Sequence, residues 1–153
     1  MARNVATDRY VDRAQVMEFV RPRHQGILTT YRHDGRLQQS PVTMGVDGQD
    51  RVVVASYPER AKSRNLRRDR RASILVISDE FNGEWVQLDG TGEVLDLPDA
   101  LEPLVEYFRV IVGEHSDWDE YRQAMIDQGK VLIRVSVDAW GPISKGGFPA
   151  RLV

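Results

Sequence analysis

Residues 26–57 read GILTTYRHDGRLQQSPVTMGVDGQDRVVVASY, and this stretch decides the fold. Its apolar and β-branched runs are separated by Asp34-Gly35 and by Asp47-Gly48. An Asp-Gly pair between two such runs is a strong hairpin signal, because it supplies the left-handed residues that a tight turn needs. The stretch therefore predicts three antiparallel strands, at Gly26–Tyr31, Leu37–Val46 and Arg51–Tyr57.

The rest of the chain adds three more strands and several helices. Strands are expected at Ala72–Ser78, Glu84–Leu97 and Lys130–Val137, and Gly90 and Gly92 inside the long second one suggest a bulge or bend. Apolar stripes at helical spacing predict helices at Tyr10–Val20 (capped by Thr7 or Asp8), Arg60–Asp69, Pro98–Val112 and Trp118–Gln128. Six strands joined mostly by hairpins indicate a closed or split antiparallel barrel rather than a doubly wound sheet.

Composition narrows the class of protein. At 153 residues the chain is most simply one domain, 1–153, with a flexible Gly- and Pro-rich tail at about 141–153. It has no cysteine and only three histidines, none at metal-ligand spacing, so a metal site is not expected. The first ten residues lack an apolar signal region, and no apolar run has membrane-spanning length, so a cytoplasmic protein is expected.

One segment stands out electrostatically. Residues 60–71, RAKSRNLRRDRR, hold seven Lys or Arg and one Asp, which gives +7 − 1 = +6, whereas the whole chain is formally −2. The remaining residues therefore sum to −2 − 6 = −8. Nucleic acid is a poor partner for so acidic a remainder, and no nucleic-acid-binding motif is present. A solvated charged face is the simplest alternative.

The position of the segment favours a bound phosphate. It follows a strand and Pro58, so the amino end of its helix lies at a strand end, where backbone N–H groups attract anions. Arg60 and Lys62 would strengthen such a site, with Asn65 one turn further along. The arginines from Arg67 to Arg71 are open to two readings, as a site for a polyanionic tail or as partners of the acidic residues between positions 99 and 127.

With these motifs, the chain resembles the pyridoxamine 5'-phosphate oxidase-like split β-barrels, and more narrowly the F420-dependent flavin/deazaflavin oxidoreductases of the B class. The resemblance rests on Arg60–Ser73 and on Gly113–Met125, GEHSDWDEYRQAM, and it covers roughly Tyr10 to Val137. It implies a mainly β (α+β) fold, a six-stranded antiparallel split β-barrel of the FMN-binding type with peripheral helices. It also implies a homodimer with two cofactor sites at the interface.

The resemblance further implies which residues bind the cofactor. Arg60 and Lys62 would hold its phosphate with Asn65 beside them, the edge strand at positions 39–43 would run along the ring, and Trp85 would approach from the partner subunit. The expected cofactor-binding residues are Gln39, Ser40, Pro41, Val42, Thr43, Ser56, Arg60, Ala61, Lys62, Arg64, Asn65 and Trp85. No catalytic side chain is assigned, because the hydride chemistry belongs to the cofactor.

The implied activity is hydride transfer between reduced coenzyme F420 and a conjugated or unsaturated small organic substrate. The surplus of arginines suits the polyanionic tail of F420 better than it suits flavin mononucleotide (FMN). Two alternatives remain: an FMN-dependent oxidase or reductase of the same fold, and a non-catalytic protein that binds F420, flavin or haem. Neither nucleic acid nor a membrane is an expected partner.

Overall fold

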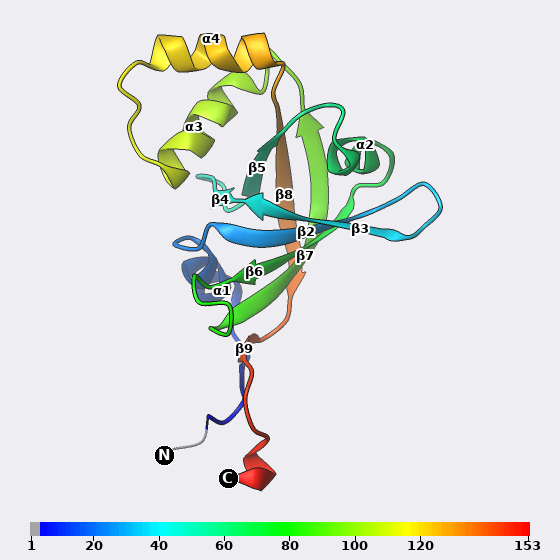
Figure 1. The fold of residues 1–153 in the computed structure, drawn as a ribbon, viewed down its shortest axis with the longest axis vertical. Coiled ribbons are helices and arrows are strands. Elements are labelled where there is room, and N and C mark those ends of the chain that lie inside the picture. The colour runs from blue at the N-terminus through cyan, green and yellow to red at the C-terminus, as the bar shows by residue number, and fades with distance from the viewer. Residues whose placement is uncertain (1–3) are drawn as a thin grey trace.

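The computed structural model describes residues 4–153, and Figure 1 shows its curled sheet with helices around it. The strands are β1 Thr7–Arg9, β2 Gln25–Tyr31, β3 Leu37–Thr43, β4 Gly45–Val46, β5 Val52–Ser56, β6 Arg71–Ile77, β7 Trp85–Leu95, β8 Val131–Trp140 and β9 Ile143–Lys145. The helices are α1 Arg13–Val20, α2 Ala61–Arg68, α3 Leu101–Ile111 and α4 Trp118–Gln128, with a short 3₁₀ turn at Ala150–Leu152. Within the described residues, no helix is long and apolar enough to cross a membrane.

The strand order forces the sheet to curl. Hydrogen-bonded neighbours run β3-β2-β6-β7-β8-β5-β4, and every pair in this path is antiparallel. The two ends of the path, β3 and β4, are separated in the chain by Met44 alone. The sheet must therefore bend round on itself, and this gives the split β-barrel. The register shifts between Asp89 and Gly90, whose partners are Ala139 and Val137, so the extra residue of the bulge is Asp138 of β8 rather than a residue of β7 as expected.

Two apolar cores hold the elements together. The first lies inside the curled sheet and includes Leu28, Ile74 and Ile133, with Val16 and Val20 of α1 packed against it. Alternation explains this core: β6 buries every second residue and leaves the others on the opposite face. The second core lies between the β5–β8 part of the sheet and helices α3 and α4, and it includes Leu104 and Leu132.

Several expectations from the sequence need correction. The sheet has nine strands in the described residues rather than six, because Leu37–Val46 divides into β3 and β4, and β1 and β9 were not expected. Helix α1 is capped by Asp12 through a capping box with Gln15, and neither Thr7 nor Asp8 caps it. The tail contains β9, which pairs with β1 and β7 and buries Ile143.

Candidate cofactor site

A cavity of about 420 Å³ lies between the sheet and the two late helices. Pro41, Val42 and Thr43 of β3 line it, as do Val54 and Ala55 of β5. Helices α3 and α4 supply Tyr107, Phe108, Tyr121 and Met125, and two cations, Lys62 and Lys130, complete the lining. The cavity thus combines apolar and aromatic walls with a few polar groups, which is the usual character of a small-molecule site.

The amino end of α2 is open to an anion. Arg60 is its N-cap residue, has extended backbone angles and makes no side-chain cap, and the first turn holds no acidic residue. By contrast, Asp117 caps α4 by accepting a hydrogen bond from the backbone N–H of Glu120. The first N–H groups of α2 therefore have no side-chain acceptor, so the positive end of its dipole is not neutralised from within the helix.

Lys62 carries an unneutralised charge into the cavity. It is half-buried, and it forms no ion pair within residues 4–153. Burial, and then the nearby Arg60 guanidinium, lower the pKa of Lys62 below its ordinary value. Both effects disfavour the ammonium form. An anion bound beside Lys62 would form an ion pair with it, and this attraction would offset the cost of burial and the repulsion by Arg60.

Three other expected residues, Gln39, Ser40 and Ser56, are not among those that line this cavity. Ser40 Oγ, next to the lining residue Pro41, is buried and has no hydrogen-bond partner among the described residues. Ser56 is buried beneath α2 and accepts a hydrogen bond of 3.4 Å from Ser63. Gln39 lies on the exposed side of β3 and donates to Thr29.

Asn65 anchors α2 to the sheet. Its Nδ2 donates to Thr30 Oγ1 at 3.0 Å, and its Oδ1 accepts from Arg68. Both ends of the amide are therefore engaged within the chain, and the residue is 6% exposed. Ala61 and Arg64 are exposed at the same helix, and Arg64 forms no ion pair with the residues that the structure describes.

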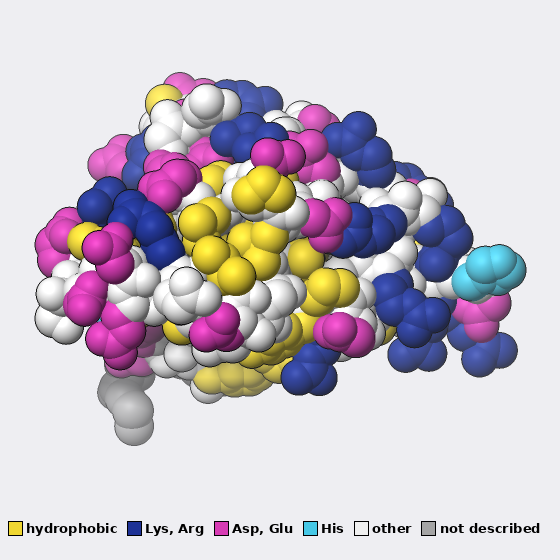
Figure 2. All heavy atoms as spheres, turned by 90° about the horizontal axis from the view of Figure 1, so that it is seen from above, with side chains coloured by type: hydrophobic (Ala, Val, Ile, Leu, Met, Phe, Trp, Pro, Cys, Tyr) yellow, Lys and Arg dark blue, Asp and Glu magenta, His cyan; other side chains and the backbone are white. Residues whose placement is uncertain are grey.

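The arginines from Arg67 to Arg71 form their ion pairs and hydrogen bonds within the chain. Arg67 forms a two-pronged contact with Asp96, at 2.9 and 2.6 Å, and Arg71 pairs with Asp69 at 2.7 Å. Arg68 and Arg70 donate to the main-chain oxygens of Tyr31 and Gly92. These partners lie outside the acidic stretch from 99 to 127. Figure 2 shows Lys and Arg gathered mostly on the side of the β2–β3 hairpin, with most acidic side chains opposite.

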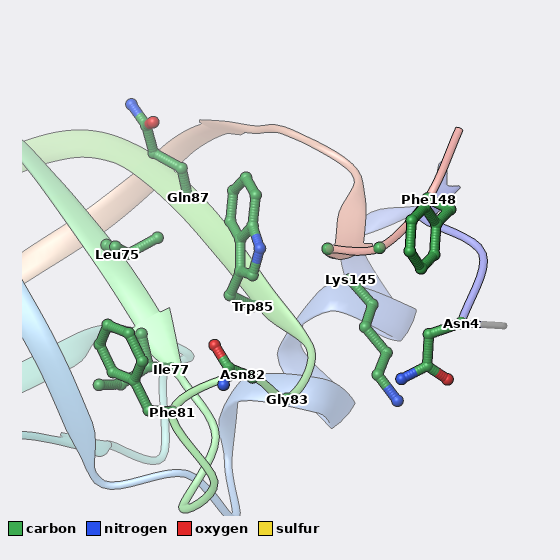
Figure 3. Close-up of a pocket in the computed structure, with 12 residues that line it drawn as sticks. Asn4, Leu75, Ile77, Phe81, Asn82, Gly83, Trp85, Gln87, Lys145 and Phe148 are labelled. Atoms are coloured by element: carbon green, nitrogen blue, oxygen red, sulfur yellow. The ribbon is translucent and has the colours of Figure 1, made fainter. Parts of the chain in front are cut away.

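Trp85 does not line this cavity. It lies at the start of β7, is 39% exposed and borders a separate, larger cavity of about 990 Å³. Figure 3 shows it with Phe81 from the β6–β7 turn on one side and Lys145 and Phe148 from the C-terminal segment on the other. Within one chain, Pro41 to Thr43 therefore line one cavity and Trp85 the other, and the remaining expected ring-site residues line neither.

The sequence did not indicate the residues contributed by α3, α4 and the start of β8. Tyr107 donates a hydrogen bond of 2.8 Å to the carbonyl of Thr43, and burial raises the pKa of Tyr107, opposed by a backbone hydrogen bond from Ala55. Lys130 follows Gly129, the left-handed residue that ends α4. The helical stripe containing Phe108 predicts core packing, and no pattern in the sequence distinguishes the cavity-lining members of that stripe.

Comparison with solved structures supports the fold. A conserved hypothetical protein from Mycobacterium tuberculosis is 22% identical with a TM-score of 0.73, and the match covers 92% of this chain and 89% of that one. A protein described as an F420 reductase is 21% identical with a TM-score of 0.59, covering 80% and 91%. An FAD- and haem-binding protein from Mycobacterium smegmatis is 14% identical with a TM-score of 0.68, covering 95% and 76%.

These identities establish a shared fold and leave the ligand open. A family model supplies the stronger evidence, because it matches residues 13–144 and therefore includes the whole of the barrel path and the α2, α3 and α4 helices. The chain belongs to the pyridoxamine 5'-phosphate oxidase family.

Proposed function

We propose that this protein is an F420-dependent oxidoreductase that passes a hydride from reduced coenzyme F420 to a conjugated or unsaturated organic substrate. The observation that carries the proposal is the half-buried Lys62, which has no acidic partner among residues 4–153 and lies at the amino end of α2, where no side chain caps the helix. A phosphate bound there would meet helix N–H groups together with Arg60 and Lys62. Family membership and the F420 reductase among the structural relatives support the same class of cofactor.

The residues present fit such a cofactor. Ser40 Oγ is an unsatisfied buried polar atom on β3, and Pro41 to Thr43 line the cavity. When bound, the reduced deazaflavin would supply the hydride. The chain would hold its phosphate, and the apolar walls would exclude water from the reacting atoms. The phenol of Tyr107 lines the cavity and donates its hydrogen to the carbonyl of Thr43, so it ties α3 to β3 beside the proposed site.

The choice of F420 over FMN rests on the number of unneutralised cations. Arg67 and Arg71 are neutralised by carboxylates, whereas Arg68 and Arg70 keep their charge but donate hydrogen bonds to main-chain oxygens of the chain itself. Arg60, Lys62 and Arg64 remain without ion pairs among the described residues. Their charge exceeds that of one phosphate group and suits a cofactor whose tail carries further carboxylates.

The proposal includes a homodimer whose partner completes the site. The outer face of the sheet places Ile27 beside Pro41 and Leu75, and Ile77 beside Trp85, so apolar side chains lie exposed or half-exposed in adjacent rows. A second copy covering this face would bury them and bring its Trp85 toward the first copy's β3. This arrangement accounts for the separation of Trp85 from the Lys62 cavity within one chain.

A cofactor screen followed by turnover tests the proposal. Purified protein should be colourless, should quench the fluorescence of added F420, and should oxidise reduced F420 when a quinone or tetrapyrrole acceptor is supplied. Protein that purifies yellow with flavin would favour the FMN-dependent alternative. Protein that binds F420 and shows no turnover with any conjugated acceptor would favour a carrier.

A further inference from the structure

Tyr57 lies between Arg60, which belongs to the proposed phosphate site, and a second cation, Lys130. The last register pair of β5 and β8 is Ser56 with Val131, which brings the next residues of the two strands, Tyr57 and Lys130, together at the strand ends. Lys130 Nζ lies 4.4 Å from the centre of the Tyr57 ring, and the Arg60 guanidinium lies 6.0 Å from it. Both distances fall within the range of cation–π attraction.

Lys130 also reaches the proposed cofactor cavity. It is half-buried and lines this cavity together with Lys62, although the two residues lie on different elements. Neither Lys62, Lys130 nor Arg60 has a carboxylate partner anywhere in residues 4–153. Lys62 and Lys130 thus bring two positive charges to a partly apolar cavity, and Arg60 lies close enough to Lys62 to repel it, so an anion bound among these cations would offset their mutual repulsion.

We infer that Lys130 is a third cation of the phosphate-binding end of the cavity, and that the Tyr57 ring positions it together with Arg60. This inference rests on the proposed function, because it assigns a further residue to the same site. Lys130 binds the anionic group, whereas Tyr57 is a positioning residue whose ring fixes the two cations. The geometry assigns the ring and not the hydroxyl to this task, because the hydroxyl lies 3.5 Å from Gln128, at the limit of a hydrogen bond.

A pair of ligands that differ only in the anionic tail tests the assignment. The titrations use coenzyme F420 and the deazaflavin nucleoside that lacks the phosphate-bearing tail, and in parallel FMN and riboflavin. Lys130→Gln should weaken binding of the phosphate-bearing member by about 10- to 100-fold, the loss of a charge-assisted hydrogen bond, and should leave the phosphate-free member unchanged. Lys130→Arg should keep most of the preference.

Tyr57 variants separate positioning from direct contact. Tyr57→Phe retains the ring and should bind both ligands like the wild type, whereas Tyr57→Leu should lose much of the preference for the phosphate-bearing ligand. Arg36→Gln is the charge-matched control, because its side chain is 82% exposed in the β2–β3 turn, and it should change neither affinity.

The outcomes separate the two proposals. If Lys62→Gln weakens the phosphate-bearing ligand and Lys130→Gln does not, the inference about Lys130 is wrong and the phosphate site stands. Equal weakening of both ligands by Lys130→Gln also overturns it, because the residue would then support the cavity rather than the anion. If neither lysine variant changes either affinity, the phosphate site and the inference fail together.

Discussion

Gly90→Ala should destabilise the protein because β8, which bulges at Asp138, approaches Gly90 so closely that it leaves no room for a side chain there. A Cβ at this position would lie 2.2 Å from the main-chain oxygen of Ser136 and 2.7 Å from Val135 Cγ1. Rotating a side chain cannot relieve the first contact, so β8 itself must shift. Overpacking of this kind lowers the free energy of unfolding by about 1–3 kcal/mol. Because the clash is with the backbone, we expect about 3 kcal/mol for Gly90→Ala. For a chain of this size that corresponds to a fall in Tm of about 6–12 °C.

Two other glycines provide graded controls for this prediction. A Cβ at Gly92 would lie 2.9 Å from Leu66 Cδ2, which is the end of a side chain that can move, so Gly92→Ala should cost less. Gly141 has no atom within 4 Å of such a Cβ, and Gly141→Ala should be neutral or slightly stabilising. Thermal unfolding followed by circular dichroism measures all three variants. A Gly90→Ala protein as stable as Gly141→Ala would refute the reasoning about the bulge.

Three further predictions concern a cap, a charge and a titration. Asp12→Ala removes the side-chain acceptor of the α1 capping box, leaves the bond from the backbone N–H of residue 12 to Gln15 in place, and should cost about 1 kcal/mol of unfolding free energy, visible in urea denaturation. Arg67→Ala should leave the affinity for F420 unchanged, because the guanidinium of Arg67 is already paired with the carboxylate of Asp96. Arg64→Ala should weaken F420 binding in the same titration. Cofactor affinity should fall as pH rises through the lowered pKa of Lys62, because only the ammonium form binds the anion, and Lys62→Ala should remove this dependence.

Local patterns in the sequence predict the barrel well. The turn at Asp34-Gly35, in which Gly35 is left-handed, and helix Trp118–Gln128 are each determined by residues close in the chain, and the structure has both. The turn after Asp47 also forms, but its left-handed residue is Asp50 rather than Gly48, and the bulge opposite Gly90 lies in β8. The strand β9 has no such pattern. It exists because Ile143 packs into the core and because β1, from the other end of the chain, pairs with it. Contacts between residues so far apart in the chain produce no periodic pattern in the local sequence.

The residues of the candidate site also differ in whether local sequence features could predict them. Lys62 and the β3 residues could be anticipated, because the helix start and the edge strand are local features. Asn65 could not be distinguished from a ligand-binding residue, since its partner Thr30 lies 35 positions away. Lys130 was missed because a lone lysine after a helix carries no signal until β5 and β8 pair and bring it to Tyr57.

The most direct test of the proposed function is the equilibrium affinity for coenzyme F420 of the wild type and of Lys62→Ala, measured by F420 fluorescence with Arg36→Gln as control. We predict that the wild type binds F420 more tightly than FMN. Lys62→Ala should weaken F420 binding by about tenfold or more, through loss of one charge-assisted hydrogen bond, while Arg36→Gln binds normally. Absence of F420 binding by the wild type, or equal affinity in Lys62→Ala, would contradict the account.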